Sequence, residues 1–403
     1  MNNPGKSRRA PARPLPAGIL FAALLLCAAA GWTQTAAPQP DSRQTALQLE
    51  KHGSNAEAEA AWRAYLDAHP ASAEAYAHLG LLQARQERYQ DAVVSYRKAL
   101  ALHATVPGVR LNLGLALFKA GQMKDAVHEF LPLYQRAPAA SPDRQRLAIL
   151  VGMSYYGAGQ FAPAVPYLKQ AAAHDSSNLA LRLTLAHSCL WSKQYQCVMD
   201  TYHEILTLNA ESAEADMLAG EALDEMKDAA GAIEQFRAAV KADPRMPDAH
   251  FGLGYLLWTK RQYPEAAPEF EAELNLNPHH AQALTYLGDV DRRLSRPDEA
   301  IQMLSKAIQI DPSIELAHLD LGEIHAEAGR RDDALREFEV AAKIAPNDVN
   351  VHWRLGRLYR TMGRQQEAKA EFARASSITE AADNALIKRM NPPSTPEAPD
   401  GSK

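Results

Sequence analysis

Residues 352–375 read HWRLGRLYRTMGRQQEAKAEFARA, and residues 318–341, which lie 34 positions earlier, read HLDLGEIHAEAGRRDDALREFEVA. The two stretches share a glycine, an alanine and a phenylalanine at the same offsets, which are Gly356, Ala368 and Phe372 in the later copy. Sliding the chain of 403 residues against itself extends the agreement to nine units. A repeat of this period predicts an array of small units rather than one large compact core.

Four columns of similar residues define the repeat, and their order predicts two helices per unit. The glycine column holds Gly80, Gly114, Gly152, Gly220, Gly254, Gly288, Gly322 and Gly356. Alanine follows 12 residues later, and a large apolar column then holds Tyr96, Phe130, Leu168, Tyr202, Phe236, Phe270, Leu304, Phe338 and Phe372. The fourth column is a proline that closes five of the units. Apolar residues recur at helical spacing on both sides of a turn such as the one at Gly329.

The four columns resemble those of the tetratricopeptide repeat (TPR). The resemblance implies an all-α fold, a TPR α-solenoid in which about ten helix-turn-helix units form a right-handed superhelix. Helices this short are marginally stable alone, so each unit must bury a face against the next one. The small glycine and alanine are expected where the two helices of a unit cross, and the large apolar residue is expected to fill the gap between units.

The N-terminal 30 residues predict a secretory signal peptide. They contain four basic residues and no acidic one, and Ala17 to Ala30 form an apolar run too short to span a bilayer comfortably. Cleavage after Ala30 or Gly31 fits the small residues there, although a retained anchor is an alternative. The chain is therefore expected to be exported, to a periplasm or to the medium, with no transmembrane span after cleavage. Removing the four cations changes the net charge from −5 to −9.

The rest of the chain divides according to the repeat. We expect a short linker and a degenerate first unit over residues 31–72, and nine units of 34 residues over residues 73–378. A four-residue insertion interrupts the period near residues 140–143. A separate capping helix is expected over residues 379–390, because a terminal unit needs a polar outer face. The proline-rich tail, residues 391–403, is expected to be disordered.

One unit, residues 179–212, departs from the pattern. Ala186 replaces the column glycine and Val198 replaces the column alanine, so both changes add volume at one helix crossing. Overpacking of this kind costs about 1–3 kcal/mol unless the helices move apart. The same unit carries Cys189 and Cys197, which are predicted either to form a disulfide or to remain as two buried thiols. In three other units Pro132, Pro166 and Pro268 are expected to kink or delay the second helix.

The sequence gives no sign of catalysis or of a cofactor. The metalloprotease motif HExxH, the phosphate-binding GxxxxGK[ST], the dinucleotide motif GxGxxG and the hydrolase motif GxSxG are all absent from it. Histidine pairs such as His279 and His280 lack the further ligands that zinc requires, so no metal site is predicted. His250, His318 and His352 share one repeat position and are expected to have a packing or surface role. Neither a basic stripe nor a basic pI suggests nucleic-acid binding.

What remains is a binding surface. In TPR proteins the first helices of the units line the concave groove. Transferred to this chain, the groove positions that we predict to bind a partner are Phe118, Tyr156, Trp191, Phe251, Tyr255, Trp258, Arg292, Trp353, Arg357 and Arg360. An acidic band that includes Glu221, Asp224 and Glu225 lies between the aromatic positions. Exposed apolar rings in such number suggest that a ligand covers them, although some of them could pack between neighbouring helices instead.

The leading hypothesis is a non-enzymatic scaffold that binds a peptide or a partner protein in the extracytoplasmic space, with a role in envelope assembly or secretion. The alternative is a glycan-binding module of a polysaccharide export system. Tyr156, Trp191, Tyr255, Trp258 and Trp353 could stack against sugar rings. The residues alone do not decide between a peptide and a glycan, because aromatic rings bind both.

Overall fold

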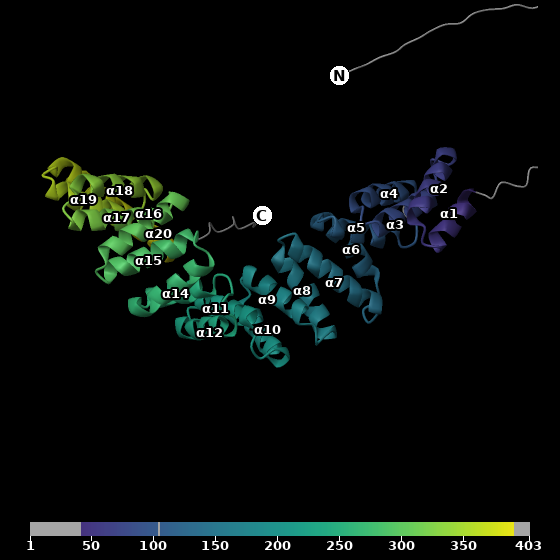
Figure 1. Ribbon diagram of the computed structural model, residues 1–403, viewed down its shortest axis with the longest axis horizontal. Coiled ribbons are helices and arrows are strands. Elements are labelled where there is room, and N and C mark those ends of the chain that lie inside the picture. Colours follow the sequence, from purple (N-terminus) through teal and green to yellow (C-terminus); the bar gives the residue numbers. More distant parts are fainter. Residues whose placement is uncertain (1–41, 104, 391–403) are drawn as a thin grey trace, which may run out of the picture.

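The computed structural model describes residues 42–103 and 105–390, and Figure 1 shows them as a curved stack of helices. The described residues form 20 α-helices and no strand. The predicted signal peptide at residues 1–30 and the predicted tail at residues 391–403 lie outside this part of the chain. None of the described helices is long and apolar enough to cross a membrane.

The helices alternate between first and second helices of successive units. The first helices are α1 (Ser42–Lys51), α3 (Ala73–Arg85), α5 (Val109–Lys119), α7 (Pro142–Gly157), α9 (Leu179–Trp191), α11 (Ala213–Glu225), α13 (Ala249–Thr259), α15 (Ala281–Arg293), α17 (Glu315–Glu327) and α19 (Val349–Thr361). The second helices are α2 (Asn55–Ala68), α4 (Tyr89–Leu102), α6 (Met123–Arg136), α8 (Phe161–His174), α10 (Tyr195–Leu208), α12 (Ala229–Ala242), α14 (Tyr263–Leu276), α16 (Pro297–Ile310), α18 (Arg331–Ile344) and α20 (Gln365–Met390).

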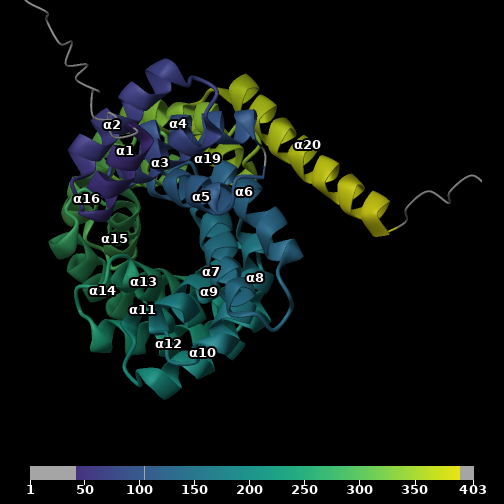
Figure 2. The ribbon, with the colours of Figure 1, turned by 90° about the vertical axis from the view of Figure 1, so that its right-hand side faces the viewer.

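The ten pairs wind into a superhelix around an open centre. Seen along this axis in Figure 2, the odd-numbered helices from α7 to α15 lie on the inner side and the even-numbered helices lie outside them. Each helix packs mainly against its neighbours in the chain, and several consecutive first helices also touch one another. The all-α solenoid predicted from the repeat is therefore confirmed.

Local sequence signals begin the helices and reverse the chain between them. Ser72, Ser212 and Asp348 cap first helices by accepting hydrogen bonds from backbone N–H groups of the first turn. Between the two helices of a unit, one residue adopts a positive φ, which closes the first helix. This residue is glycine in five units, as at Gly329 and Gly363, and it is charged or polar in the other five, as at Glu87 and Ser295. The turn therefore accepts residues with a side chain, whereas the sequence had predicted a glycine there.

The glycine column makes room for the large apolar column of the same unit. A Cβ atom built at Gly322 would lie 2.4 Å from Cε1 of Phe338, and one built at Gly356 would lie 2.6 Å from Cε1 of Phe372. Phe236 also reaches Gly252 of the following unit, where a Cβ would lie 2.5 Å from its ring. The large residue therefore fills the space at the helix crossing of its own unit. As Phe236 shows, it can also reach the space between units, where it was predicted to lie.

Two expected irregularities take a different form in the structure. The insertion near residues 140–143 lengthens α7, which has 16 residues where most first helices have 13, and Ser141 caps it. Pro132, Pro166 and Pro268 lie inside helices of 14 residues that begin in the same register as other second helices. The expectation that these prolines delay their helices was wrong, because packing against neighbouring helices fixes where each helix begins.

The deviant unit carries a disulfide between α9 and α10. Cys189 and Cys197 are bonded, and their Cα atoms lie 5.8 Å apart, within the usual range for a disulfide. Ala186 and Val198 are both buried at the crossing of the two helices. The hydroxyl of Tyr202 lies within hydrogen-bond distance of two oxygens of the next unit, Oε1 of Gln235 at 2.7 Å and Oδ1 of Asp216 at 3.0 Å. The added volume is therefore accommodated between two cross-linked helices.

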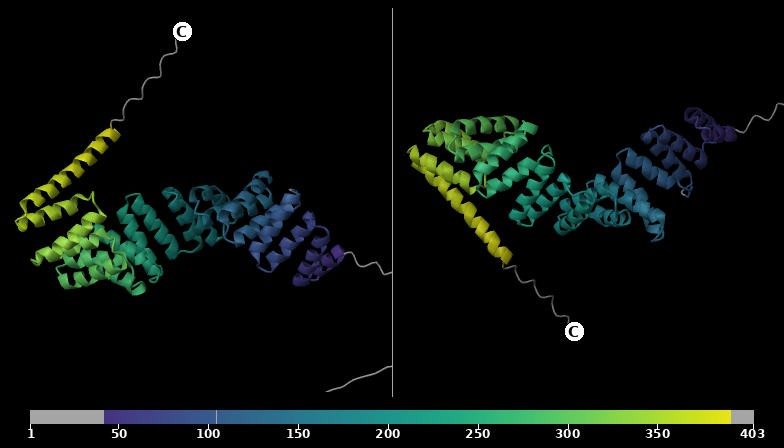
Figure 3. Two further views of the ribbon diagram at one scale, coloured as in Figure 1. Left: turned by 90° about the horizontal axis from the view of Figure 1, so that it is seen from above. Right: turned by 60° about the horizontal axis from the view of Figure 1, so that its bottom comes forward.

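The C-terminal end differs from the expected separate capping helix. Residues 379–390 continue α20, which runs for 26 residues without a break. Gly and Pro are absent between Gln365 and Met390, so nothing in this stretch ends the helix after the tenth unit. Figure 3 shows α20 extending away from the stack. Leu386, Ile387 and Met390 are exposed on this extension.

The repeated histidines connect the second helix of a unit to the loop before the first. Nδ1 of His318 lies 2.7 Å from Oε2 of Glu337, and Nε2 lies 3.2 Å from the carbonyl oxygen of Pro312. His250 and His352 make the same two contacts in their own units. Three histidines in equivalent positions thus have equivalent partners, which indicates a structural role at a unit junction.

Candidate binding groove

The predicted groove residues all lie on first helices, and their neighbours determine which of them a ligand can reach. Most of them occupy three positions of the helix, three residues before the glycine column and one and four residues after it. Because these positions face the adjacent first helix as well as the groove, a ring there can be covered by the next unit. The exposed fraction of each side chain therefore shows whether it can contact a ligand or packs between helices.

Trp191 is the most accessible ring in the middle of the groove. Its side chain is 52% exposed, although it contacts two rings from neighbouring helices and the His187 ring of its own helix. The Phe161 ring packs edge-on against it at 4.4 Å between centroids, and the Tyr156 ring is parallel to it at 6.1 Å. These neighbours hold the indole in one orientation while leaving about half of it open to a ligand. A rigid, half-exposed indole is suited to anchoring a ligand.

Tyr255 and Trp258 are more involved in the scaffold than their spacing suggested. Both rings pack against Tyr286 of α15, with centroid distances of 5.3 and 4.9 Å. The indole Nε1–H of Trp258 donates a hydrogen bond of 2.6 Å to the buried carboxylate of Asp289. Tyr255 also lines the groove, whereas Trp258 joins α13 to α15.

The basic residues predicted near the C-terminal end do not act as one patch. Arg292 is largely buried and forms ion pairs with carboxylates of α15 and α17, so its charge is neutralised inside the protein. Arg357 and Arg360 of α19 are exposed, and the Arg360 guanidinium lies 5.8 Å from the centroid of the Phe372 ring. Trp353 is also 52% exposed. Of the four predicted residues at this end, Trp353, Arg357 and Arg360 are exposed.

At the N-terminal end the groove is apolar. Leu111 and Leu115 of α5 are 36% and 39% exposed, and Phe118 is half-buried against the adjoining core. No charged side chain separates these three positions along the groove face of α5. This segment offers a shallow apolar surface, in contrast to the polar middle of the groove.

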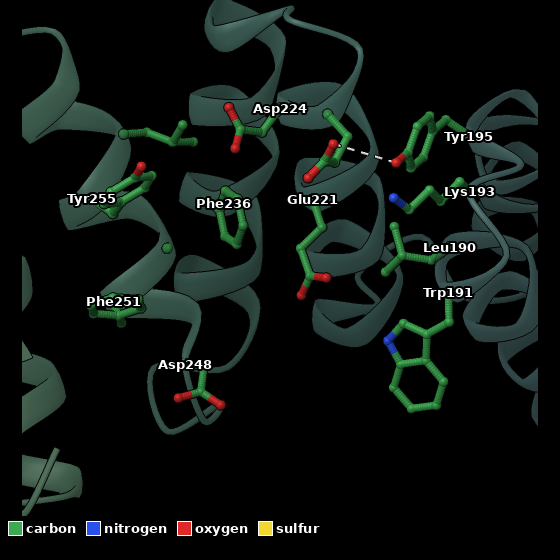
Figure 4. Close-up of a pocket in the computed structure, with 13 residues that line it drawn as sticks. Leu190, Trp191, Lys193, Tyr195, Glu221, Asp224, Phe236, Asp248, Phe251 and Tyr255 are labelled. Atoms are coloured by element: carbon green, nitrogen blue, oxygen red, sulfur yellow. Dashed lines mark hydrogen bonds between the residues drawn. The ribbon is translucent and has the colours of Figure 1, made fainter. Parts of the chain in front are cut away.

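A pocket opens between α9 and α13, and Figure 4 shows its lining. Its volume is about 470 Å³. Trp191, Tyr195, Phe251 and Tyr255 supply aromatic rings, while Glu221, Asp224, Glu225 and Asp248 supply carboxylates. The pocket exists because α11 and α13 lack the close packing that α9 and α11 have. α13 also begins late, at Ala249, after Pro247 and the positive φ of Asp248.

Electrostatics in the pocket are dominated by negative charge. Burial raises the pKa of Glu221, and the nearby charge of Asp248 raises it further against the lowering effect of His187. The hydroxyl of Tyr195 donates a hydrogen bond of 3.4 Å to Glu225. Among the described residues, Lys193 is the one lysine or arginine that lines the pocket.

Comparison with family models decides the classification. Three models, each described as tetratricopeptide repeat, match this sequence. The matched residues are 44–107, 200–247, 217–274, 251–313, 292–348 and 349–381, which together make up more than half of the chain. The chain belongs to the tetratricopeptide repeat family. No curated protein matches the sequence.

Solved structures similar to this TPR protein are smaller and distant in sequence. A crystal structure of MamA covers 41% of this chain and 96% of that chain, at 24% identity and a TM-score of 0.38. YrrB, titled a TPR protein with an unusual peptide-binding site, covers 47% of this chain and 97% of its own at 22% identity and a TM-score of 0.38. The pilF protein of Pseudomonas aeruginosa covers 54% and 93% at 16% identity and a TM-score of 0.43.

One cluster in this TPR array has the composition of a metal site. Oxygen and nitrogen atoms of Asp248, Glu273 and His280 lie within 4.8 Å of one another. However, Nδ1 of His280 accepts the backbone N–H of Ala283, so the ring carries its proton on Nε2, which lies 3.3 Å from Asp248. Glu273 accepts the N–H of Phe251. Neither ring nitrogen of His280 has a free lone pair for a metal. We therefore conclude that His280 serves to cap the N-terminus of α15.

Three charged or aromatic residues that line the pocket were not predicted from the sequence. Lys193 lies in the turn after α9, Tyr195 begins α10, and Asp248 lies in the loop before α13. The groove was predicted from first helices alone, so residues of turns and loops were outside the pattern. The sequence RMPDAH, with a proline two residues before the helix, was the signal that the helix begins late and that a gap opens there.

Proposed function

We propose that this protein is a non-enzymatic TPR scaffold that holds a peptide, or a segment of a partner protein, in its concave groove. The observation that carries the proposal is the half-exposed Trp191, which two fixed aromatic neighbours hold in place at the middle of the groove. Exposed leucines of α5 extend the apolar surface towards the N-terminal end. A peptide can cover both surfaces at once, because it presents apolar side chains along an extended chain.

The proposed location is the extracytoplasmic space, with a role in envelope assembly or secretion. Its support is the basic and then apolar composition of residues 1–30, which is typical of a signal peptide. In that compartment the Cys189–Cys197 disulfide is stable, because oxidising conditions maintain such bonds.

A glycan ligand is less well supported than a peptide. Stacking on sugars requires open ring faces, and of the five rings considered only Trp191 and Trp353 are about half exposed. Tyr255 and Trp258 pack against Tyr286, and Tyr156 packs against Phe161. The rings therefore do not form a continuous platform along the groove.

Replacing Trp191 with alanine should weaken peptide binding by about 2 kcal/mol or more, which is roughly a 30-fold loss of affinity. The measurement is retention of a random 12-residue peptide library on the purified protein, followed by titration of the best peptides. The melting temperature should change little, because the lost contacts are half-exposed. Ile310→Ala, an exposed apolar position on α16 outside the groove, is the matched control and should bind as the wild type does. Equal binding by both variants would contradict the assignment of the groove.

A further inference from the structure

The central pocket combines two kinds of side chain that favour the same ligand. On one side, Trp191 and Tyr195 come from α9 and α10, and on the other, Phe251 and Tyr255 come from α13. The carboxylates of α11 lie between these two walls, as Figure 4 shows for Glu221 and Asp224. Aromatic faces carry partial negative charge and attract cations, as carboxylates do.

The protein compensates the carboxylates of the pocket only in part, because the charge of His187 acts on Glu221 and His280 pairs with Asp248. Glu221 and Asp224 have no side-chain hydrogen bond or ion pair with any residue in the described part of the chain. Glu225 has only the tyrosine hydroxyl, and Asp248 has only His280. Lys193 supplies one positive charge against four carboxylates. The pocket therefore retains a net negative charge within a partly buried volume, where a cation gains more from electrostatic attraction than it would in open water.

The other groove segments that the structure describes lack this combination. The apolar segment of α5 has no carboxylate on its groove face, and the buried carboxylates of α15 and α17 are already paired with arginines. The second acidic surface, near Glu323 and Glu327 of α17, also contains Arg331, Arg354 and Arg357. The pocket between α9 and α13 is thus the place where aromatic rings meet uncompensated negative charge.

We propose that this pocket binds the side chain of an arginine or a lysine of the peptide held in the groove. The inference rests on the proposed function, because it names the partner segment as a basic peptide. The aliphatic stem of the residue lies against Trp191 and Tyr255, and its charged end lies between Glu221 and Asp224. A pocket of about 470 Å³ has room for one such side chain and the adjoining backbone.

The test uses an immobilised peptide library in which one position at a time is fixed as arginine, lysine, citrulline, leucine or glutamate. Citrulline keeps the shape of arginine without its charge. The wild-type protein should retain peptides with arginine or lysine at one position at least tenfold better than peptides with citrulline there. The double variant Glu221→Gln/Asp224→Asn should lose this preference while still binding apolar positions of the same peptides.

The matched control is Glu271→Gln/Asp298→Asn, which removes the same two charges from exposed positions on α14 and α16. It should keep the preference for arginine and lysine within twofold of the wild type. Equal retention of arginine and citrulline peptides, or an unchanged preference in the double variant, would overturn the assignment of the pocket. Peptides retained through apolar residues and released by Trp191→Ala would then still support the proposed function. If the library retains no peptide at all, both proposals fail.

Discussion

The Arg292→Met variant is expected to lose about 3–5 kcal/mol of unfolding free energy, because it removes the cation shared by two buried carboxylates. Asp289 keeps its contact with Arg293, but Asp320 loses its ion pair. Arg292 contacts three carboxylates, two of which are buried. Nη2 donates to Oδ1 of Asp289 at 2.9 Å, and Nη1 lies 3.0 Å from Oε2 of Glu323. Nε lies 3.1 Å from Oδ1 of Asp320, close enough for an ion pair although not aligned as a hydrogen bond. Asp289 and Asp320 are 0% and 1% exposed.

The pKa values of these carboxyls give the expected pH dependence. Burial raises the pKa of Asp320 well above its usual range, and the negative charge of Asp289 adds to this. Burial also acts on Asp289, but hydrogen bonds from Arg293 and Trp258 outweigh it and leave the pKa of Asp289 lowered. Without Arg292 the pKa of both carboxyls should rise in the folded state. A raised carboxyl pKa destabilises the protein above the unfolded-state pKa near 4, and this penalty disappears as the pH falls below that value.

The measurement is urea unfolding of the wild type and Arg292→Met at pH 7 and at pH 4.5. The difference in stability should be largest at pH 7 and clearly smaller at pH 4.5. Arg360→Met is the control, because Arg360 is exposed and faces only the Phe372 ring, so its loss should cost less than about 1 kcal/mol. Equal stability of the two variants at pH 7 would show that the buried carboxylates do not depend on Arg292.

The repeat columns could be predicted from the sequence, whereas this network of charged residues could not. Gly322 and Phe338 recur in most units because every unit needs the same helix crossing, so they predict the fold. Asp289, Arg292 and Asp320 occupy positions that vary from unit to unit, so no period reveals them. Their pairing depends on how α15 and α17 lie together in space. Arg292 was therefore predicted as a groove cation, although it neutralises a buried acidic cluster.

The candidate site shows the same limit. Trp191 and Tyr255 were placed in the groove because the resemblance assigns their helix positions to it. Their accessibility was not predictable, because it depends on the rings of neighbouring units, such as Phe161 and Tyr286. The pocket itself arises from the gap between α11 and α13, which is a property of the superhelix. Likewise, the separate capping helix was expected from the needs of a terminal unit, but the sequence between Gln365 and Met390 contains no Gly or Pro that would end α20 before residue 379.

The second large effect is expected for Gly322→Leu, which should destabilise the protein by about 3 kcal/mol, at the upper end of the range for overpacking. A Cβ at position 322 would lie 2.4 and 2.5 Å from two ring atoms of Phe338, which is itself 3% exposed in the core. The ring cannot move outwards, because the cluster of Leu319, Leu355 and their neighbours packs around it. Either α17 and α18 must separate or Phe338 must leave its position, and both disrupt the junction with the tenth unit.

Gly363→Leu is the matched control, because it introduces the same side chain in a turn. A Cβ at position 363 would have nothing within 4 Å, so the cost comes only from its φ of +79°. That backbone cost is about 1–2 kcal/mol, and Glu87, Lys193 and Arg261 occupy the equivalent turn in other units with φ near +60°. Thermal unfolding followed by circular dichroism should therefore show a clearly larger loss of melting temperature for Gly322→Leu than for Gly363→Leu. Comparable losses would mean that the glycine column is retained for backbone freedom and not to admit the ring of the large apolar column.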